Sequence, residues 1–130
     1  MSLGLPQTTI DYDRLMREHL TRVFNERDAS IRLKAIKEIY AADATLYESP
    51  DSSAQGHVAI NQAVDALLLS LPPAFTFTPI GPAIGHNGVG RIRWQSGPLN
   101  GPVAVTGMDV IHFVNGRIHS TYVFLDPPAA

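Results

Sequence analysis

Residues 75–125 read FTFTPIGPAIGHNGVGRIRWQSGPLNGPVAVTGMDVIHFVNGRIHSTYVFL, and this stretch decides the fold. Asn-Gly pairs stand at 87–88, 100–101 and 115–116, and β-prone segments lie between them. Asn-Gly readily adopts the positive φ angles of tight hairpin turns, so each pair predicts a strand reversal. Three consecutive reversals predict a four-stranded antiparallel meander that opens at Phe75. Its later strands are expected over 89–96, 102–114 and 117–125, and Pro79 and Pro82 place the first strand at an edge or a bulge.

The chain before this meander predicts mainly helices. Periodic apolar residues indicate three helices. The first covers 11–27, and the second begins at 28 or 30 and ends at about Tyr40. The third contains the apolar stripe 60–71 and is stopped by Pro72-Pro73. A short strand is expected over 43–48, followed by a polar loop. Helices segregated from an antiparallel sheet indicate the α+β class.

Composition indicates one soluble globular domain of 130 residues. We expect an ordered core over about 8–126 and a flexible tail over 127–130. The formal net charge of −2 argues against nucleic-acid binding, and the basic group of Arg32, Lys34 and Lys37 is explained by a solvated helix face.

Several other classes are excluded by composition. The sequence has no cysteine, so disulfides and thiolate chemistry are excluded. No stretch has the length of a membrane span, and residues 1–6 lack the features of a signal peptide, so we expect a cytoplasmic protein. The five histidines lack metal-ligand spacing, and we expect neither metal nor cofactor.

Two motifs add a family resemblance. Ile39-Tyr-Ala-Ala-Asp-Ala-Thr45 is followed by a short strand and by Gly56-His-Val-Ala-Ile60, and Gly107-Met-Asp-Val-Ile-His-Phe-Val-Asn-Gly-Arg-Ile118 lies near the end. In this order, over about 11–126, the chain resembles the nuclear transport factor two-like superfamily, in its SnoaL-like and ketosteroid isomerase branch. The resemblance implies a cone-shaped, cystatin-like α+β roll with three N-terminal helices on a curved antiparallel sheet. It also implies a deep apolar pocket and a homodimer formed through the sheet face.

Glu48 is a candidate catalytic base. It follows Leu46 by two residues, so both side chains leave the strand on one face, and an inward Leu46 would aim Glu48 at the pocket mouth. A carboxylate in apolar surroundings suits proton abstraction beside a carbonyl. The family's base also aligns with Glu48 when no gap is placed, whereas a gap that superimposes the proline puts Ser49 there. A solvated strand-end carboxylate is the alternative.

Asp109 is the second candidate catalytic residue. It shares a face with Val105, Ile111 and Phe113 in a strand that we expect to be central, so it must be paired, protonated or beside a cavity. The resemblance places it on the aspartate that in ketosteroid isomerases stays protonated and donates a hydrogen bond to a developing enolate. Those isomerases are a well-known example of pKa tuning. A structural aspartate, satisfied by backbone amides or a tyrosine, is the alternative.

The chain departs from the family's catalytic patterns. The isomerase oxyanion tyrosine maps onto Leu20, and the last-strand aspartate of SnoaL cyclases and epoxide hydrolases maps onto Val123. This chain therefore lacks the tyrosine that steroid isomerisation needs and the aspartate that those cyclases and hydrolases need. Tyr12 or His19 could replace the missing tyrosine hydroxyl. The residues expected to line the substrate pocket are Tyr12, Met16, His19, Leu20, Tyr40, Trp94 and Ile111.

Two questions of register stay open in the sequence. A two-residue turn at Asn115-Gly116 would turn Ser120, Tyr122 and Phe124 toward the face of Asp109, whereas a loop with a glycine bulge would turn His119, Thr121, Val123 and Leu125 there. In the 91–94 segment, burying two arginines is costly, so we expect Trp94 to face inward or a dimer interface.

The sequence thus predicts a protein that binds a small apolar organic ligand. As an enzyme it would be a cofactor-independent isomerase, cyclase or dehydratase acting on a carbonyl compound. A non-catalytic ligand-binding protein is the competing hypothesis. A third is a dimerising accessory domain that uses the outer sheet face around Met108 and Val110.

Overall fold

The structure is a computed structural model, and it describes residues 9–127. Three predictions concern residues outside this range. They are the start of the ordered core at residue 8, the lack of signal-peptide features in residues 1–6, and the flexible tail beyond Pro127. No helix in the described part of the chain is long and apolar enough to cross a membrane.

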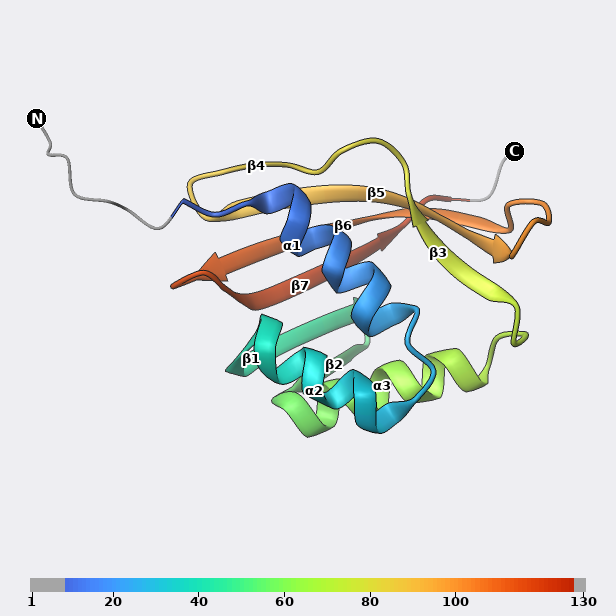
Figure 1. Ribbon diagram of the computed structural model, residues 1–130, viewed down its shortest axis with the longest axis horizontal. Coiled ribbons are helices and arrows are strands. Elements are labelled where there is room, and N and C mark those ends of the chain that lie inside the picture. Colours follow the sequence, from blue (N-terminus) through green and yellow to red (C-terminus); the bar gives the residue numbers. More distant parts are fainter. Residues whose placement is uncertain (1–8, 128–130) are drawn as a thin grey trace, which may run out of the picture.

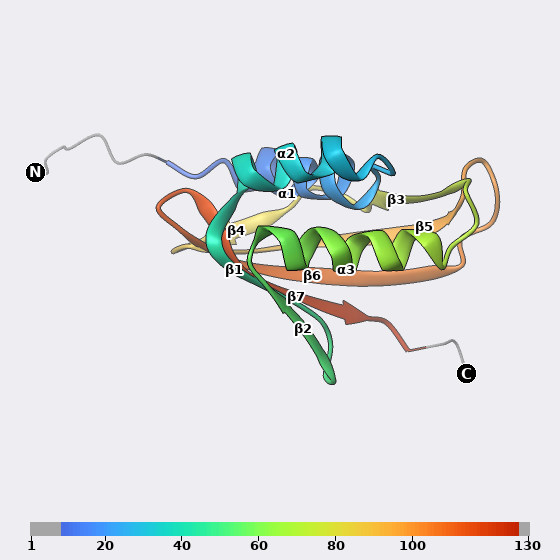
Figure 2. The same cartoon turned by 90° about the horizontal axis from the view of Figure 1, so that it is seen from below.

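A curved sheet forms one layer and the helices cover one of its faces (Figures 1 and 2). The helical segments are α1 (Tyr12–Glu18), a π-helix (His19–Phe24), α2 (Ala29–Ile39) and α3 (His57–Leu69). The strands are β1 (Tyr40–Ser49), β2 (Ser52–Gln55), β3 (Phe75–Pro79), β4 (Ile84–His86), β5 (Val89–Pro98), β6 (Val105–Val114) and β7 (Arg117–Leu125). The strand order is β2-β1-β7-β6-β5-β3, with β4 also paired to β5.

The α+β class is confirmed, and the sheet needs one correction. All expected meander pairings are antiparallel, but β1 runs parallel to β7, so the seven-stranded sheet is mixed. Residues 52–55, expected to be a polar loop, form β2 and pair with β1. The β1–β2 hairpin projects from the body of the molecule (Figure 2).

The first helix, expected over 11–27, runs without a break from Tyr12 to Phe24, and its second half is a π-helix. The Asp11 side chain caps α1 by accepting from the backbone N–H of Arg14 at 3.0 Å. The following turn widens into a π-helix, which closes when the N–H of Asn25 donates to the Leu20 carbonyl at 2.8 Å. Asn25 then ends the helix, because its side-chain amide exchanges two hydrogen bonds, of 2.8 and 2.7 Å, with the backbone of Phe77 in β3.

Arg32 corrects the expectation of a solvated basic helix face. Its side chain is fully buried between α2 and α3, where it pairs with Asp65 at 2.7 Å and with Asn61 at 2.8 Å. Lys34 and Lys37 are exposed, as expected. Arg32 therefore contributes to the helix–helix contact and not to a basic surface.

The Asn-Gly turns form as the sequence predicts. Asn87-Gly88 and Asn115-Gly116 take positive φ at both residues, which is the geometry of a type I′ hairpin turn. At the middle pair only Asn100 has positive φ, and the N–H of Gly101 donates to the Pro98 carbonyl at 2.9 Å. The first strand splits into β3 and β4 at the edge, where Pro79 and Pro82 predicted an interruption.

The last hairpin combines the two alternatives that the sequence left open. Its turn has two residues, and Phe113 pairs with Ile118, but the register then shifts so that His112 pairs with Ser120. His119 is the extra residue of a β-bulge. Beyond the bulge, Val123 pairs with Asp109 and faces the helices, whereas Tyr122 is exposed on the outer face.

Candidate functional site

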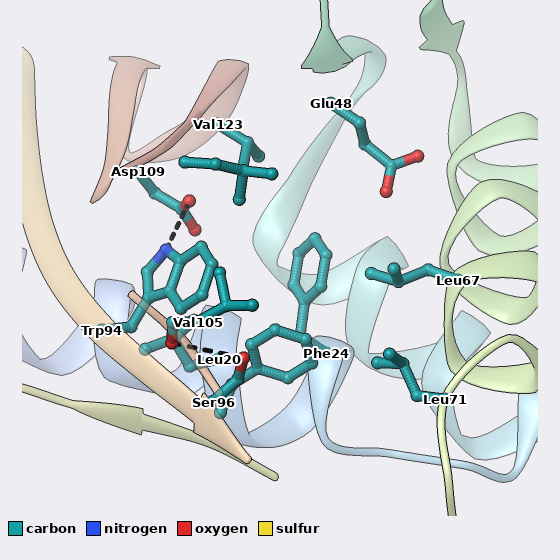
Figure 3. Close-up of a pocket in the computed structure, with 12 residues that line it drawn as sticks. Leu20, Phe24, Glu48, Leu67, Leu71, Trp94, Ser96, Val105, Asp109 and Val123 are labelled. Carbon is teal, nitrogen blue, oxygen red and sulfur yellow. Dashed lines mark hydrogen bonds between the residues drawn. The ribbon is translucent and has the colours of Figure 1, made fainter. Parts of the chain in front are cut away.

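A half-open apolar cavity of about 190 Å³ lies between the helices and the sheet (Figure 3). Its lining comes from the π-helix, from α3 and its end, and from β1, β3, β5, β6 and β7. The lining residues are Leu20, Phe24, Glu48, Leu67, Leu71, Phe77, Trp94, Ser96, Val105, Asp109, Val123 and Leu125. Among the described residues, Glu48 and Asp109 are the only ionisable side chains in this lining, and they lie on different walls (Figure 3).

Glu48 is half-buried and lies on the same side of the cavity as Leu67 of α3, across from Asp109 and Trp94 (Figure 3). Strand β1 alternates as predicted, with Leu46 buried and Tyr47 exposed, so Glu48 shares the inward face of Leu46. Partial burial raises the pKa of the Glu48 carboxyl. Among residues 9–127, no hydrogen bond or ion pair to this carboxyl is formed, so its oxygens are free to meet a ligand.

Asp109 is buried in the opposite wall and bonded through both of its oxygens. The indole Nε1–H of Trp94 donates to Oδ1 at 2.9 Å, and Nε2 of His19 lies 2.7 Å from Oδ2. Only 2% of Asp109 and none of His19 is exposed to solvent. The carboxyl is therefore both paired and beside a cavity, which combines two of the options that its apolar surroundings allowed.

Tyr40 extends this group to a fourth element, strand β1. Its hydroxyl is hydrogen-bonded to Nδ1 of His19, so Tyr40, His19, Asp109 and Trp94 form one buried chain of polar contacts. Burial first, and then the nearby Asp109 carboxylate, raises the pKa of the Tyr40 phenol well above its usual range. Tyr40 is thus a neutral phenol that can donate a proton.

Gly107 makes room for the Trp94 contact. The two residues pair across β5 and β6, and a side chain at Gly107 would come within 2.4 Å of the Trp94 ring. Because Gly107 has no side chain, the indole can lie against β6 and reach Asp109, two residues along the same strand. The hydrogen bond from Trp94 to Asp109 therefore depends on the glycine opposite Trp94.

The π-helix supplies His19 from the other side. Helical spacing turns Met16, His19, Leu20, Val23 and Phe24 toward the sheet, and all five are buried. Within this set Leu20 and Phe24 reach the cavity and His19 reaches Asp109. Single π-turns inside helices frequently occur at functional sites, which agrees with the position of this one.

Four of the nine residues named from the sequence line the cavity: Glu48, Asp109, Leu20 and Trp94. Trp94 faces inward, as expected from the cost of burying two arginines. His19 and Tyr40 lie behind Asp109 and reach the cavity only through it. The structure thus places both behind Asp109 and outside the lining that residues 9–127 form.

The other three do not line the cavity: Tyr12, Met16 and Ile111. The Tyr12 ring lies against Gly85 and Gly90, its hydroxyl accepts from the N–H of Gly88 at 2.8 Å, and the Met16 sulfur also lies over Gly90. Ile111 pairs with Gly90 in the neighbouring strand. These side chains fill the space at the far end of the sheet, where glycines let helix α1 approach closely.

Sequence reasoning left out several lining residues. Phe24, Leu67 and Leu71 belong to the predicted apolar helix faces, so their inward direction was predictable but their contact with a cavity was not. Ser96 carried no signal beyond its place two residues after Trp94. Its hydroxyl is 3.5 Å from the Val105 carbonyl, which is a long contact, so Ser96 can also turn to a ligand.

The described part of the chain holds no cluster of three or more histidine or acidic side chains suited to a metal ion. His112 and His119 lie ring to ring at 5.7 Å on the outer sheet face, with Asp43 4.0 Å from His119. This group is distant in the fold from the cavity face and plays no part in the site.

The fold has many known counterparts, although the sequence has few. No family model matches the chain, and no curated protein matches it. A proposed isomerase of the SnoaL-like family from Agrobacterium tumefaciens is 23% identical, with a TM-score of 0.81 over 89% of this chain and 97% of that one. The fold is that of SnoaL-like and nuclear transport factor two-like proteins.

Two further structures agree with this assignment of fold. A proposed polyketide cyclase from Sinorhizobium meliloti is 18% identical, with a TM-score of 0.64 over 85% of this chain and 93% of that one. A proposed ketosteroid isomerase from Kribbella flavida is 13% identical, with a TM-score of 0.66 over 92% of this chain and 83% of that one. At such identities the likeness carries the fold, and the chemistry must be argued from the cavity.

Proposed function

We propose that this protein binds a small uncharged organic compound and performs general acid–base chemistry beside a carbonyl group, as an isomerase, cyclase or dehydratase does. The observation that carries the proposal is the placement of Glu48 and Asp109 on different walls of one apolar cavity. Two carboxyl groups that flank a bound substrate can remove a proton on one side and supply one on the other.

The size and lining of the cavity limit the ligand. An apolar protein cavity of roughly 150 Å³ is large enough to bind benzene. The volume of about 190 Å³ therefore suits a compound with one ring inside the cavity and further groups at its open side. No lysine, arginine or histidine belongs to the lining formed by residues 9–127, so an anionic substrate would find two carboxyl groups and no cationic partner.

The site differs from the isomerase pattern in its hydrogen-bond donors. Leu20, where the resemblance places the oxyanion tyrosine, lines the cavity with an apolar side chain, and Val123 does so where the cyclases carry an aspartate. Within residues 9–127, Ser96 supplies the one hydroxyl of the lining, and this hydroxyl is available to bond a carbonyl oxygen. The structural neighbours described as isomerases and cyclases support proton-transfer chemistry, and the different donors point to a different substrate.

The proposal is tested by hydrogen–deuterium exchange beside the carbonyl of cyclohexanone and 2-indanone, followed by NMR. The wild type is expected to accelerate the exchange, and Glu48→Gln and Asp109→Asn are expected to lower the rate by at least about 100-fold. Glu38→Gln, at an exposed glutamate on α2, is the matched control and should retain the wild-type rate. A wild-type rate no faster than buffer with both ketones would contradict this function.

A non-catalytic ligand-binding protein is the second candidate, and one observation favours it. Both oxygens of Asp109 already hold protein hydrogen bonds, as in a structural aspartate. Thermal stabilisation by apolar ketones and phenols separates the candidates. Stabilisation that is lost in a cavity-blocking Leu71→Trp variant, without any exchange, would support the binding protein.

We also propose that the outer sheet face forms a homodimer. The rings of Tyr47 and Tyr122 stack there at 4.7 Å, and both are exposed together with Phe124. Large apolar patches of this kind commonly mark interfaces. Sedimentation equilibrium should give a dimer for the wild type and a monomer for Phe124→Lys, and a monomeric wild type would refute the interface.

A further inference from the structure

We propose that Tyr40 and His19 are positioning residues that hold Asp109 as an ionised hydrogen-bond acceptor, so that Asp109 is the base of this site and Glu48 is its acid. The inference rests on the proposed acid–base function and deepens it. It reverses the roles that the family resemblance implied for the two carboxyl groups.

The first step is the direction of the hydrogen bonds at Asp109. The indole of Trp94 can only donate, so Oδ1 is an acceptor. His19 can either donate to Oδ2 or accept a proton from it, according to which ring nitrogen carries the hydrogen. The tautomer of His19 therefore decides whether Asp109 is a carboxylate or a carboxylic acid.

The second step is that Tyr40 selects the tautomer. Within residues 9–127 the Tyr40 hydroxyl bonds Nδ1 of His19, and the buried Thr121 hydroxyl, which holds no other hydrogen bond there, lies beside it. If Nδ1 carried the proton, Tyr40 would accept from it and donate to Thr121, and the hydrogen of the fully buried Thr121 hydroxyl would have no acceptor, which is costly. If Tyr40 donates to Nδ1, Nε2 carries the proton and donates to Asp109, and Thr121 can donate to the Tyr40 oxygen. Every hydroxyl and ring hydrogen in this group of contacts then has an acceptor.

The third step concerns the groups that face Asp109 from each neighbouring element. His19 comes from the π-helix, Tyr40 lies behind His19 at the start of β1, and Trp94 comes from β5. Glu48, from the far end of β1, is the only other ionisable group in the cavity lining. None of the bonded groups offers Asp109 an acceptor in this arrangement, so a proton on Asp109 has nowhere to point except the cavity.

Glu48 has the complementary environment. Its carboxyl is partly buried among apolar side chains and has no donor within the described residues, so burial raises its pKa and it keeps its proton to a higher pH. Two carboxyl groups whose surroundings favour opposite protonation states divide naturally into base and acid. Asp109 has two donors and favours the charged state; Glu48 has none and favours the neutral one.

The reaction step follows from this division. Asp109 removes a proton from the carbon beside the ligand's carbonyl, and the electron pair of that C–H bond forms the carbon–carbon double bond of an enol. The carbonyl π electrons move to oxygen, which takes the proton of Glu48. Asp109 ends protonated and Glu48 ionised. In a ligand whose enol is conjugated to a second carbon–carbon double bond, Asp109 then gives its proton to the far carbon of that bond while the enol hydroxyl returns its proton to Glu48, which completes an isomerisation. No oxidant or further reactant is consumed.

The decisive measurement is the tautomer of His19, read from long-range ¹H–¹⁵N NMR spectra of the labelled wild type at neutral pH. We expect the proton on Nε2 and none on Nδ1. His57 is an internal reference, because its Nε2 lies 2.9 Å from the Tyr40 backbone carbonyl and must donate to it. A proton on Nδ1 of His19, alone or together with one on Nε2, would overturn the proposal. This result does not depend on whether any ketone turns over.

The pH profile of ketone exchange tests the same chain through activity. Tyr40→Phe removes the donor to Nδ1, which makes Nε2–H a weaker donor to Asp109. We expect the acid limb of the profile to move toward neutral pH by about one unit, with a roughly 10-fold loss of rate at low pH and recovery at higher pH. Tyr12→Phe, which removes a hydrogen-bonded hydroxyl outside the cavity, is the matched control and should leave the profile unchanged.

The two carboxyl variants complete the test of roles. Glu48→Gln should remove the alkaline limb of the profile, whereas Asp109→Asn should lower the rate at every pH. An acid limb that disappears in Glu48→Gln would assign the base to Glu48 and refute the division. A Tyr40→Phe profile of unchanged shape, with only a lower melting temperature, would refute the role of Tyr40.

Discussion

Two walls of one cavity hold chemically identical groups in opposite circumstances. On the paired wall, formed by Trp94 and Asp109 with His19 and Tyr40 behind them, the Asp109 carboxyl is buried and both of its oxygens form hydrogen bonds. On the open rim, formed by Glu48, Leu67, Leu71 and Leu125, the carboxyl has only apolar neighbours and solvent. The difference shows that the surroundings, rather than the residue type, decide what each acid can do.

The largest expected effect comes from breaking the paired wall at its centre. His19→Leu would leave Asp109 with one donor and the Tyr40 hydroxyl without its acceptor, and both groups are buried. Removing one partner of a buried charged pair typically costs about 3–5 kcal/mol, so the free energy of unfolding in urea should fall by about that amount. His19→Gln can still donate one hydrogen bond to Asp109 and should lose less. Equal losses in the two variants would show that the hydrogen bonds add nothing beyond packing.

A smaller effect is expected from a substitution that displaces the Trp94 ring but leaves every polar group of the paired wall in place. Gly107→Ala places a methyl group against the Trp94 ring and should cost about 1–3 kcal/mol through strain. Trp94 is the only tryptophan in the chain, so its fluorescence reports directly on the indole. We expect a shifted emission maximum as the bond to Asp109 lengthens. An unchanged spectrum would mean that the ring has free space beside β6.

The smallest expected effect belongs to the open rim. Because burial raises the pKa of Glu48, the folded protein holds this proton to a higher pH than the unfolded chain does, and stability falls as pH rises through that interval. Glu48→Gln should therefore gain stability over the wild type above the interval and match it below. The gain should stay under about 1 kcal/mol, since solvent still reaches the carboxyl. Urea titrations at pH 4 and pH 7 would reveal it, and a loss at pH 7 would contradict it.

The hairpin turns and helix faces could be predicted because their causes are local. Asn-Gly at 87–88 and 115–116 specifies its own backbone geometry, and the apolar stripe of the third helix needs no distant partner. The π-turn at 19–24 and the bulge at His119 could not be predicted, because each depends on how two elements meet. Asn25, for example, ends the helix by bonding Phe77, which is 52 residues away.

The site was half predictable for the same reason. An aspartate on an apolar strand face demands a partner, so position 109 could be singled out from the sequence alone. Its partners could not, since His19 lies 90 residues away in sequence on the π-helix, and the contact with Trp94 depends on Gly107 in the neighbouring strand. Glu48 could be aimed inward by alternation from Leu46, a two-residue argument that needs no tertiary information.

The bulge at His119 determines which side chains of β7 face the cavity. If the same two-residue turn were followed by an unbroken ladder, His119 would pair with His112, and Tyr122 would take the place of Val123 opposite Asp109. Every side chain of β7 beyond Ile118 would then point to the opposite surface, and an aromatic ring would occupy the space beside the acid. One extra residue in this strand therefore decides that the cavity wall next to Asp109 is aliphatic.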